Sequence, residues 1–569
     1  TEMEMTDNTG NYPSRCLVEI LEKSGVKDVV ACPGSRNSPL LIALSRSKTI
    51  KTTMVVDERS AGFIALGIAS ISMRPVGIVC TSGTAVLNFS PAVAEAYYRK
   101  VPLIVISADR PMEWIDQDDS QTLRQPGVLQ NFVKKSYDIP GFETPDMRWF
   151  SNRTINDAML TAAAAPAGPV HINIQISEPL GLFVTPDQQA ERTVSMVTPR
   201  EDLTVSEARI LGDYLASPKK VMVVAGFMAP DSTLNKALRK LSMLPNVIIL
   251  TETIANLHGE DFVSDIDATI SAIPEDRKSE FAPEVVITLG GALVSRFVKQ
   301  YLREIRPLEH WQIGKSLTTV DCFRCLTKRV EMQPGLFIQQ LASAMQPHRA
   351  ECDYRKKWII ARDAARSLHR SYVAKAPWSD LKAFDTFMHL IPRNYNIQLS
   401  NGTPIRYAQL FHSREFHRCD CNRGVSGIDG STSTAVGASM VYKSAPTLLV
   451  TGDMSAQYDL GALASRCLTP RFKMIVMCND GGGIFHFIKA TRHLDIVGKC
   501  FDEPCNFPAR GVAEAFGLRY FEAENEAALR SAFSQFVSEK DLPAMLAIRT
   551  SADISAEVLI GFFSEKLKQ

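Results

Sequence analysis

Short apolar runs alternate with helix-like stretches along the whole of this 569-residue chain. The runs are followed by glycine or polar turn residues, which is typical of strands in a parallel sheet. The predicted strands are Asp28–Ala31, Thr53–Val56, Gly77–Cys80, Leu103–Ser107, Val170–Ile176, Lys220–Ala225, Val247–Leu250, Val285–Leu289, Ile397–Leu399, Thr447–Val450, Lys473–Met477 and Ala544–Ile548. This alternation predicts an α/β fold whose sheets are mostly parallel and flanked by helices such as Ala61–Ser70 and Ala92–Arg99.

The length of the chain predicts several domains, because one hydrophobic core does not grow to this size. A polar, proline-containing stretch from Glu178 to Thr204 and a charged stretch from Gln346 to Lys357 are typical of linkers. They divide the chain into three α/β units, which we expect to be domains at residues 1–185, 200–345 and 370–569.

Composition excludes some classes of partner. A formal charge of +1 gives no general attraction for nucleic acid or an anionic membrane, so any preference for anions must be local. No apolar run is long enough for a membrane span, and residues 1–10 are polar and acidic, unlike a signal peptide. The twelve cysteines do not form a disulfide framework for so long a chain. We therefore expect a cytoplasmic protein.

Two strand ends in the last third carry groups suited to a metal and a diphosphate. Gly452 to Ser455 follows one predicted strand, and Asn479 to Gly483 follows the next. Magnesium prefers oxygen ligands, which Asp453, the Asn479 amide and the Gly481 carbonyl would supply, while Gly452 and the glycines from Gly481 let the backbone approach the diphosphate. Each segment alone is more commonly a plain turn. Their occurrence at two successive strand ends favours the metal site.

A single acid in the first third adds a second chemical group. Glu58 follows a predicted strand and precedes the small-residue helix Ala61–Ser70. A carboxyl group in this place suits a proton relay to an aminopyrimidine ring, although an acid at a helix start also complements the helix dipole. A diphosphate and an aminopyrimidine occur together in thiamine diphosphate, so the two half-sites jointly predict this cofactor with Mg²⁺ or Mn²⁺.

Several turns beside these half-sites combine glycine, serine and a cation. They are Pro33–Arg36, Thr81–Ala85, Ala108–Pro111, Arg124–Gly127 and Asn422–Gly430. With Asp57 to Arg59, these motifs resemble those of the 2-succinyl-5-enolpyruvyl-6-hydroxy-3-cyclohexene-1-carboxylate (SEPHCHC) synthases, thiamine-dependent enzymes of menaquinone biosynthesis. The resemblance covers the first and last thirds closely and the middle third weakly.

The resemblance implies an activity and an architecture. The activity is decarboxylation of 2-oxoglutarate followed by 1,4-addition of the resulting enamine to isochorismate, giving SEPHCHC and carbon dioxide. The domains would be pyrimidine-binding, Rossmann-like and diphosphate-binding in that order. The cofactor would lie between subunits of a homodimer or homotetramer, with contacts from Gly83, Ser455 and Gly482 and with Ile428 as the apolar wedge that bends it.

Both implied substrates are dicarboxylates, so their pocket needs cations. Arginine suits this task because its planar fork binds a carboxylate at two points and stays charged. The positions that match the family's substrate residues are Ser35, Arg36, Arg110, Ser120, Gln121, Arg296, Arg406 and Arg423. One departure is Gly402, where the family has a serine; whether Thr403 replaces that hydroxyl stays open.

Other interpretations of these residues remain. The nearest is a different thiamine enzyme, such as an acetolactate-synthase-like ligase or a simple 2-oxoacid decarboxylase, and a more distant one is an inactive binding protein on the same fold. Cys322 with Cys325 forms a lone CxxC pair, and the histidines and cysteines between His412 and Cys421 have no standard zinc spacing. Neither group predicts a metal site.

Overall fold

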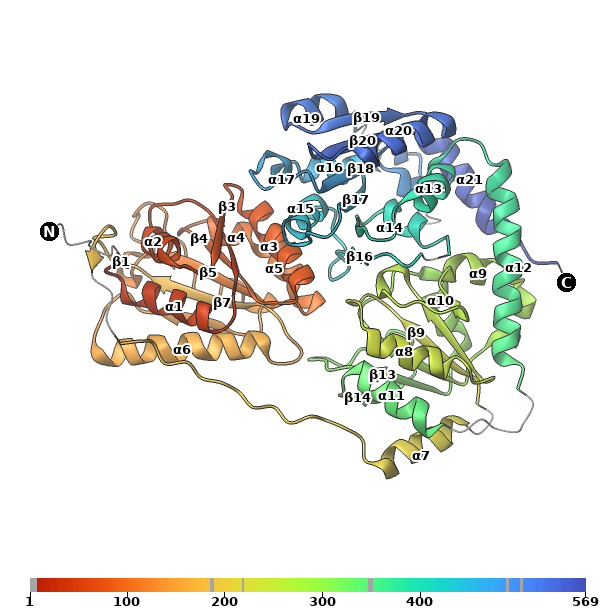
Figure 1. Ribbon diagram of the computed structural model, residues 1–569, viewed down its shortest axis with the longest axis horizontal. Coiled ribbons are helices and arrows are strands. Elements are labelled where there is room, and N and C mark those ends of the chain that lie inside the picture. Colours follow the sequence, from red (N-terminus) through yellow and green to blue (C-terminus); the bar gives the residue numbers. More distant parts are fainter. Residues whose placement is uncertain are drawn as a thin grey trace. The chain divides into compact units, whose positions relative to one another are not determined.

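The computed structural model describes residues 8–184, 189–216, 219–345, 352–412, 414–487, 491–501 and 505–568. It contains three six-stranded sheets, and their strands pair in parallel fashion with helices on the sheet faces (Figure 1). The predicted α/β class is therefore confirmed. In the described part of the chain, no helix has the combination of length and apolar character that a membrane crossing requires.

The chain divides by its contacts into two compact units. Unit 1 comprises Thr1–Thr198, Gly424–Lys443 and Tyr458–Phe472, and unit 2 comprises Pro199–Arg423, Ser444–Gln457 and Lys473–Gln569. Two segments from the last third of the sequence thus pack with the first third. No local pattern indicates this division, because it follows from contacts between residues far apart along the chain.

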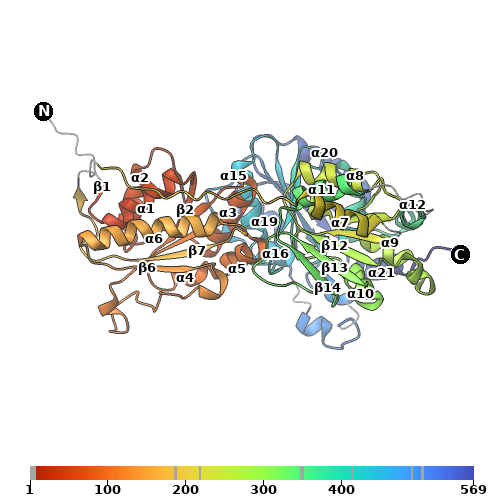
Figure 2. The ribbon, with the colours of Figure 1, turned by 90° about the horizontal axis from the view of Figure 1, so that it is seen from below.

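Unit 1 is built on one sheet. Its strand order is β3 (Lys51–Met54), β2 (Asp28–Ala31), β4 (Val76–Cys80), β5 (Leu103–Asp109), β7 (Val170–Gln175) and β6 (Ser136–Ile139). The flanking helices are α1 (Tyr12–Lys23), α2 (Ser38–Arg46), α3 (Glu58–Ser72), α4 (Ala85–Asn88), α5 (Ser90–Arg99) and α6 (Pro145–Ala163). A hydrophobic cluster joins α1, α2 and α6 to one face of the sheet, and α5 lies on the other face (Figure 2). The short strands β1 (Asn8–Thr9) and β8 (Phe183–Val184) pair separately in antiparallel fashion.

The last-third segments of unit 1 contribute α15 (Ser431–Val441) and α17 (Gly461–Ala464). Helix α15 packs along α3 at very short range (Figure 1). An added Cβ at Gly437 would lie 2.0 Å from the Ile64 carbonyl oxygen, and one at Gly67 would lie 2.0 Å from that of Thr434. The two helix backbones touch here because glycine has no side chain to separate them.

We expect Gly437→Ala to destabilise the protein by at least about 3 kcal/mol, the upper range for overpacking, because the added methyl meets backbone that no side-chain rotation can clear. The free energy of unfolding in urea measures this. Gly511→Ala is the matched control, since Gly511 also lies in a helix, α19 (Ala509–Ala515), and its added Cβ meets nothing within 4 Å. Equal stabilities of the two variants would contradict the close crossing.

Unit 2 contains the other two six-stranded sheets. The first has the order β11 (Phe262–Val263), β10 (Val247–Thr251), β9 (Val221–Ala225), β12 (Val285–Leu289), β13 (Glu309–Ile313) and β14 (Leu326–Val330). Its helices are α7 (Val205–Ala216), α8 (Ser232–Leu241), α9 (Ile266–Ala272), α10 (Arg296–Ile305), α11 (Pro334–Ala344) and α12 (Tyr354–Lys375). Alternate residues of β9 enter opposite cores: Val221 and Val223 pack toward α8 and α11, and Met222 and Val224 toward α10 and α12.

The other sheet of unit 2 has the order β16 (Arg418–Cys421), β15 (Asn396–Leu399), β17 (Thr447–Gly452), β18 (Phe472–Cys478), β20 (Ala544–Arg549) and β19 (Arg519–Ala523). Its helices are α13 (Asp380–Leu390), α14 (Thr403–Ala408), α16 (Asp453–Tyr458), α18 (Gly483–Phe487), α20 (Glu526–Ser538) and α21 (Ala552–Ser564). The Asn256 side chain exchanges two hydrogen bonds with the Cys419 backbone, at 2.7 and 3.0 Å, and so ties β16 to the segment that follows β10.

Some predicted boundaries were wrong. The predicted strand Thr53–Val56 lies two residues too late, since β3 ends at Met54 and Val56 is 80% exposed. The predicted linker Glu178–Thr204 includes β8, and its residues 185–188 lie outside the described residues. In the stretch Gln346–Lys357, residues 346–351 also lie outside them, and the remainder enters α12.

Candidate active site

The end of β17 and the end of β18 are joined through one buried carboxylate. Asp453 begins α16 directly after β17, and its Oδ2 accepts hydrogen bonds from the backbone N–H groups of Asn479 and Gly481, both at 3.1 Å. The Met454 N–H donates to Oδ1 at 2.8 Å. Asp453 is only 3% exposed, and burial raises its pKa to about 6 although these three donors act in the opposite direction. The structure thus brings together the two segments that the sequence placed 26 residues apart.

The Asn479 side chain is held in one orientation. Its Nδ2 donates to Asp380 Oδ2 at 2.9 Å, and Asp380 in turn accepts a hydrogen bond from the Thr550 hydroxyl. Because the amide nitrogen is turned to Asp380, the amide oxygen is turned away from it, as a metal ligand requires. Sequence reasoning missed Asp380 and Thr550, which lie far from the motif and are recognisable only by contact.

The loop after β18 has the backbone shape expected for binding a diphosphate. Gly481 and Gly482 have φ values of 76° and 66°, in the left-handed region that glycine adopts without strain. At the end of β17, a Cβ added to Gly452 would face open space. Ser455, the third residue of α16, is buried. A carboxylate, an oriented amide and a glycine that leaves room for a ligand fit a magnesium diphosphate.

Glu58 is the first residue of α3, but it does not cap the helix. The capping residue is Asp57, whose side chain accepts hydrogen bonds from the Arg59 N–H and the Ser60 hydroxyl, both at 3.0 Å. Within the described residues the Glu58 carboxylate makes no hydrogen bond or ion pair with another side chain. Burial raises its pKa, and the Asp57 charge adds to this. Because Asp57 supplies the cap, Glu58 is available for proton exchange.

Gly83 lies in a turn that a buried glutamine fixes. Gly83 has a φ of 87°, and its N–H donates to Gln125 Oε1 at 2.8 Å. Gln125 itself donates to the Ala108 carbonyl and to Asn173 Oδ1. The Gln121 backbone lies 3.6 Å from the position of a Cβ added to Gly83. Gln125 is a positioning residue that sequence reasoning missed, because nothing in its motif distinguished it from its neighbours.

Five of the predicted substrate residues lie in unit 1. Arg36 is 4% exposed, donates to the Ile176 carbonyl at 2.9 Å and pairs with Glu178 at 3.2 Å. Burial and the nearby Arg110 both lower its pKa. Arg110 pairs with Asp119 at 2.9 Å and donates to the Ser120 carbonyl. The side chains of Ser35, Ser120 and Gln121 are exposed. These arginines therefore have internal carboxylate partners that the sequence did not predict.

In unit 2, Arg296, Arg406 and Arg423 come together, and we call them the arginine cluster. Burial, together with the charges of Arg296 and Arg423, lowers the pKa of Arg406 to about 10. The Arg406 Nε is buried and has no hydrogen-bond partner among the described residues. Arg423 donates to Asn401 Oδ1 at 3.0 Å. Three cations from α10, α14 and the end of β16 thus converge, which predicts a site for an anion.

Ile428 lies in unit 1, in the segment between β16 and α15. Gly402 has a φ of 91° and directly precedes α14, where Thr403 is the first residue. Cys322 and Cys325 are free thiols, and no cluster of metal-binding side chains is found in the described ranges.

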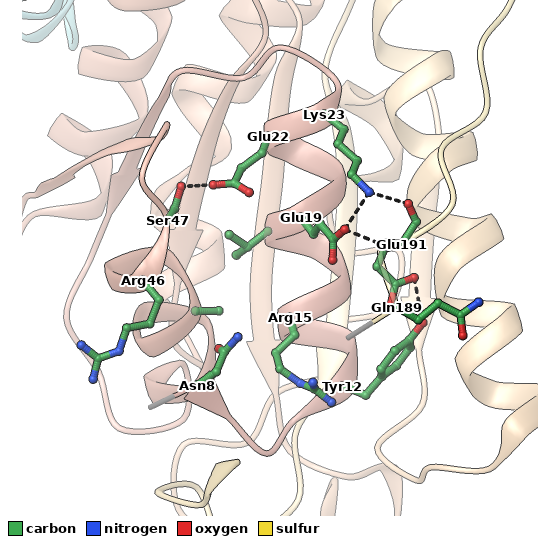
Figure 3. Close-up of a pocket in the computed structure, with 12 residues that line it drawn as sticks. Asn8, Tyr12, Arg15, Glu19, Glu22, Lys23, Arg46, Ser47, Gln189 and Glu191 are labelled. Carbon is green, nitrogen blue, oxygen red and sulfur yellow. Dashed lines mark hydrogen bonds and ion pairs between the residues drawn. The ribbon is translucent and has the colours of Figure 1, made fainter. Parts of the chain in front are cut away.

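Unit 1 also has a hollow of about 340 Å³ between α1, α2 and the segment after residue 188 (Figure 3). Its charged groups largely satisfy one another, since Lys23 pairs with Glu19, Ser47 donates to Glu22 and the Tyr12 hydroxyl donates to Glu191. None of the predicted site residues lines it. We interpret these contacts as a structural network that holds the segment around Glu191 in place.

Comparison with known proteins agrees with the site chemistry. Residues 14–128 match the family model of the thiamine pyrophosphate enzyme N-terminal TPP binding domain. A 2-succinyl-5-enolpyruvyl-6-hydroxy-3-cyclohexene-1-carboxylate synthase of Porphyromonas gingivalis is 38% identical over 556 residues, which is 96% of each chain. Proteins with the same name from Bacteroides thetaiotaomicron and Flavobacterium johnsoniae are 36% and 34% identical over 97% of this chain and 98% of their own.

Proposed function

This chain belongs to the family of SEPHCHC synthases, and on that premise we propose that it decarboxylates 2-oxoglutarate and adds the remaining four-carbon unit to isochorismate in a 1,4 sense. The products are SEPHCHC and carbon dioxide, and the pathway is menaquinone biosynthesis. Thiamine diphosphate and a divalent cation, Mg²⁺ or Mn²⁺, are the cofactors. When bound, they supply a thiazolium that stabilises a carbanion and a metal that holds the diphosphate.

The observation that carries the proposal is the position of Asp453 between the two strand ends. Asp453, the Asn479 amide oxygen and the Gly481 carbonyl are the proposed metal ligands, and Gly452, Ser455 and Gly482 the proposed diphosphate contacts. The geometry supports this because Asp453 orders both loops at once, and Asp380 holds the Asn479 amide. In unit 1, Gly83 and Ile428 are the proposed contacts to the rest of the cofactor.

Glu58 is the proposed catalytic residue. Its carboxyl group, half-buried and not used as a cap, exchanges a proton with the aminopyrimidine ring of the cofactor. The raised pKa supports this role, because burial favours the protonated form of this carboxyl group more than it would in an exposed glutamate.

The arginines are the proposed substrate-binding residues. The arginine cluster lies in unit 2, and Arg36 and Arg110 lie in unit 1 with Ser35, Ser120 and Gln121. They neutralise the substrate carboxylates and help exclude water from the reacting carbon. An almost neutral chain thus gains a local preference for dicarboxylates.

The wider organisation is part of the same proposal. The three domains lie at residues 1–185, 200–345 and 370–569, and residues 1–7, 185 and 569 at their edges lie outside the described residues. The protein works as a homodimer or homotetramer whose active site lies between subunits, and it is cytoplasmic.

The proposal is tested by incubating the protein with 2-oxoglutarate, isochorismate, thiamine diphosphate and Mg²⁺, while isochorismate absorbance and carbon dioxide release are followed. We expect both to change together. A parallel reaction contains pyruvate in place of 2-oxoglutarate. Stable isochorismate in the first reaction and consumed pyruvate in the second would instead indicate an acetolactate-synthase-like ligase or a simple decarboxylase.

We expect Arg406→Ala to lower kcat/KM roughly 10- to 150-fold, which corresponds to about 1.5–3 kcal/mol, because a charge-assisted hydrogen bond to the substrate is lost. Steady-state kinetics with each substrate varied in turn measures this and identifies the substrate that Arg406 contacts. Arg209→Ala is the control, since that side chain is 79% exposed on α7. An unchanged kcat/KM for both substrates would remove Arg406 from the site.

A further inference from the structure

A buried glutamate holds the turn that leads into the arginine cluster. Glu252 follows β10 and is 2% exposed. Its Oε1 accepts hydrogen bonds from the N–H groups of Val294 and Ser295, both at 2.8 Å, and these residues directly precede Arg296. Its Oε2 is buried and has no hydrogen-bond partner among the described residues. One oxygen therefore orders the start of α10, and the other is left for electrostatic interaction.

The charged groups that face Glu252 come from three elements. Asp267 of α9 accepts a hydrogen bond from the Ser295 hydroxyl and lies close enough to Glu252 for their charges to repel. Arg423, at the end of β16, attracts Glu252. Lys299, one turn into α10, is attracted by Glu252 and repelled by Arg423, and its Nζ donates to the Leu293 carbonyl at 3.0 Å. Asn256 fixes this arrangement, because it ties β16 to the segment after Glu252.

We propose that Glu252 is a positioning and specificity-determining residue, whose carboxyl group orders the start of α10 and whose charge sets how strongly the arginine cluster and Lys299 attract a carboxylate substrate. The inference rests on the proposed function, since it takes the arginine cluster to be the substrate site. It adds two residues that sequence reasoning did not find. Glu252 adjusts the electrostatic attraction of the arginine cluster for a carboxylate, and Lys299 is a fourth cation that contributes to that attraction.

The sign of the effect follows from the charge. When Glu252 is ionised, its negative charge offsets part of the field of Arg423 and Lys299, and an anionic ligand binds more weakly. When Glu252 is protonated, the cations act on the ligand without this opposition. Burial raises the pKa of Glu252 to about 7, with Asp267 adding to the rise and Arg423 reducing it. Substrate affinity should therefore fall as the pH rises through neutrality.

The test compares the pH dependence of KM in the parental holoenzyme and in Glu252→Gln. Glutamine keeps an oxygen to accept the Val294 and Ser295 hydrogen bonds and removes the charge. We expect KM for one carboxylate substrate to rise several-fold between about pH 6 and pH 8 in the parental enzyme. In the variant it should stay at the low-pH value. The carboxyl groups of 2-oxoglutarate and isochorismate are ionised throughout this range, so the substrates themselves do not produce such a change.

A spectroscopic measurement separates this inference from the proposed function. In the parental protein, the infrared band of a protonated buried carboxyl group should decrease as the pH rises through about 7, and that component should be absent from Glu252→Gln. Glu557→Gln, at an exposed position on α21, should behave like the parental protein in both measurements. Parallel KM profiles, or no difference between the infrared titrations, would overturn the inference alone. A parental protein that does not consume isochorismate would overturn the proposed function and this inference with it.

Discussion

Glu58→Gln is expected to lower kcat by about 10²- to 10⁴-fold, the usual contribution of a positioned acid or base. Glutamine fills the same space at the first position of α3, and Asp57 continues to cap the helix. The variant should therefore unfold at the same temperature as the parental protein and still bind thiamine diphosphate. What it loses is the ability to exchange a proton with the cofactor ring, so the chemical step slows while binding persists.

The measurements are kcat with saturating cofactor, cofactor affinity by calorimetry, and thermal unfolding. Glu113→Gln is the matched control, since Glu113 is an exposed glutamate of unit 1. Near-normal turnover in Glu58→Gln would show that Glu58 does not exchange a proton with the cofactor ring. A large fall in unfolding temperature would show that Glu58 is needed for the fold, in which case its kinetic effect would not identify a relay.

Asp453→Ala is expected to abolish magnesium-dependent cofactor binding, with a loss of affinity of at least about 100-fold. Two effects combine. The metal loses its carboxylate ligand, and the N–H groups of Asn479 and Gly481 lose the acceptor that holds their loop beside β17. An unsatisfied buried donor costs about 1–3 kcal/mol, so the binding loop should also lose order.

Calorimetric titration of thiamine diphosphate, with and without Mg²⁺, measures the loss. Asp541→Ala removes an exposed carboxylate from the same unit and should leave affinity unchanged. Because Asp453 also has a structural role, Asp453→Asn is a useful second variant, which keeps the side-chain volume. If both Asp453 variants bind the cofactor as the parental protein does, the metal site lies elsewhere.

The sequence predicted central strands well and edge strands poorly. Runs such as Leu103–Ser107 and Val285–Leu289 are mostly apolar, because both faces of a central parallel strand are buried. Edge strand β14 contains Lys328 and Arg329, and charged residues at a sheet edge conceal the strand pattern. The misplaced end of β3 has the opposite cause, since Val55 and Val56 are apolar but lie beyond the strand.

The candidate site shows the same division between local and long-range information. The meeting of Asp453 with Asn479 could be predicted, because the carboxyl ends of neighbouring parallel strands lie at one edge of a sheet. The partners that orient or oppose the predicted residues could not. Asp380, Glu178 and Glu252 are acids without a distinguishing motif, and only the folded chain brings them to Asn479, Arg36 and the turn before α10.

Unit 1 is assembled from segments in the first and last thirds of the chain, and this affects how the protein folds during its synthesis on the ribosome. Helix α3 leaves the ribosome early, but α15, which packs against it through Gly67 and Gly437, follows only after the whole middle third has been made. Until then the apolar face of α3 that α15 covers is exposed to water or to other chains. Multidomain proteins are most prone to aggregate while such hydrophobic surface is exposed. A fragment that ends near Thr198 would carry this exposed face permanently, so we expect it to depend on chaperones in a way that the full chain does not.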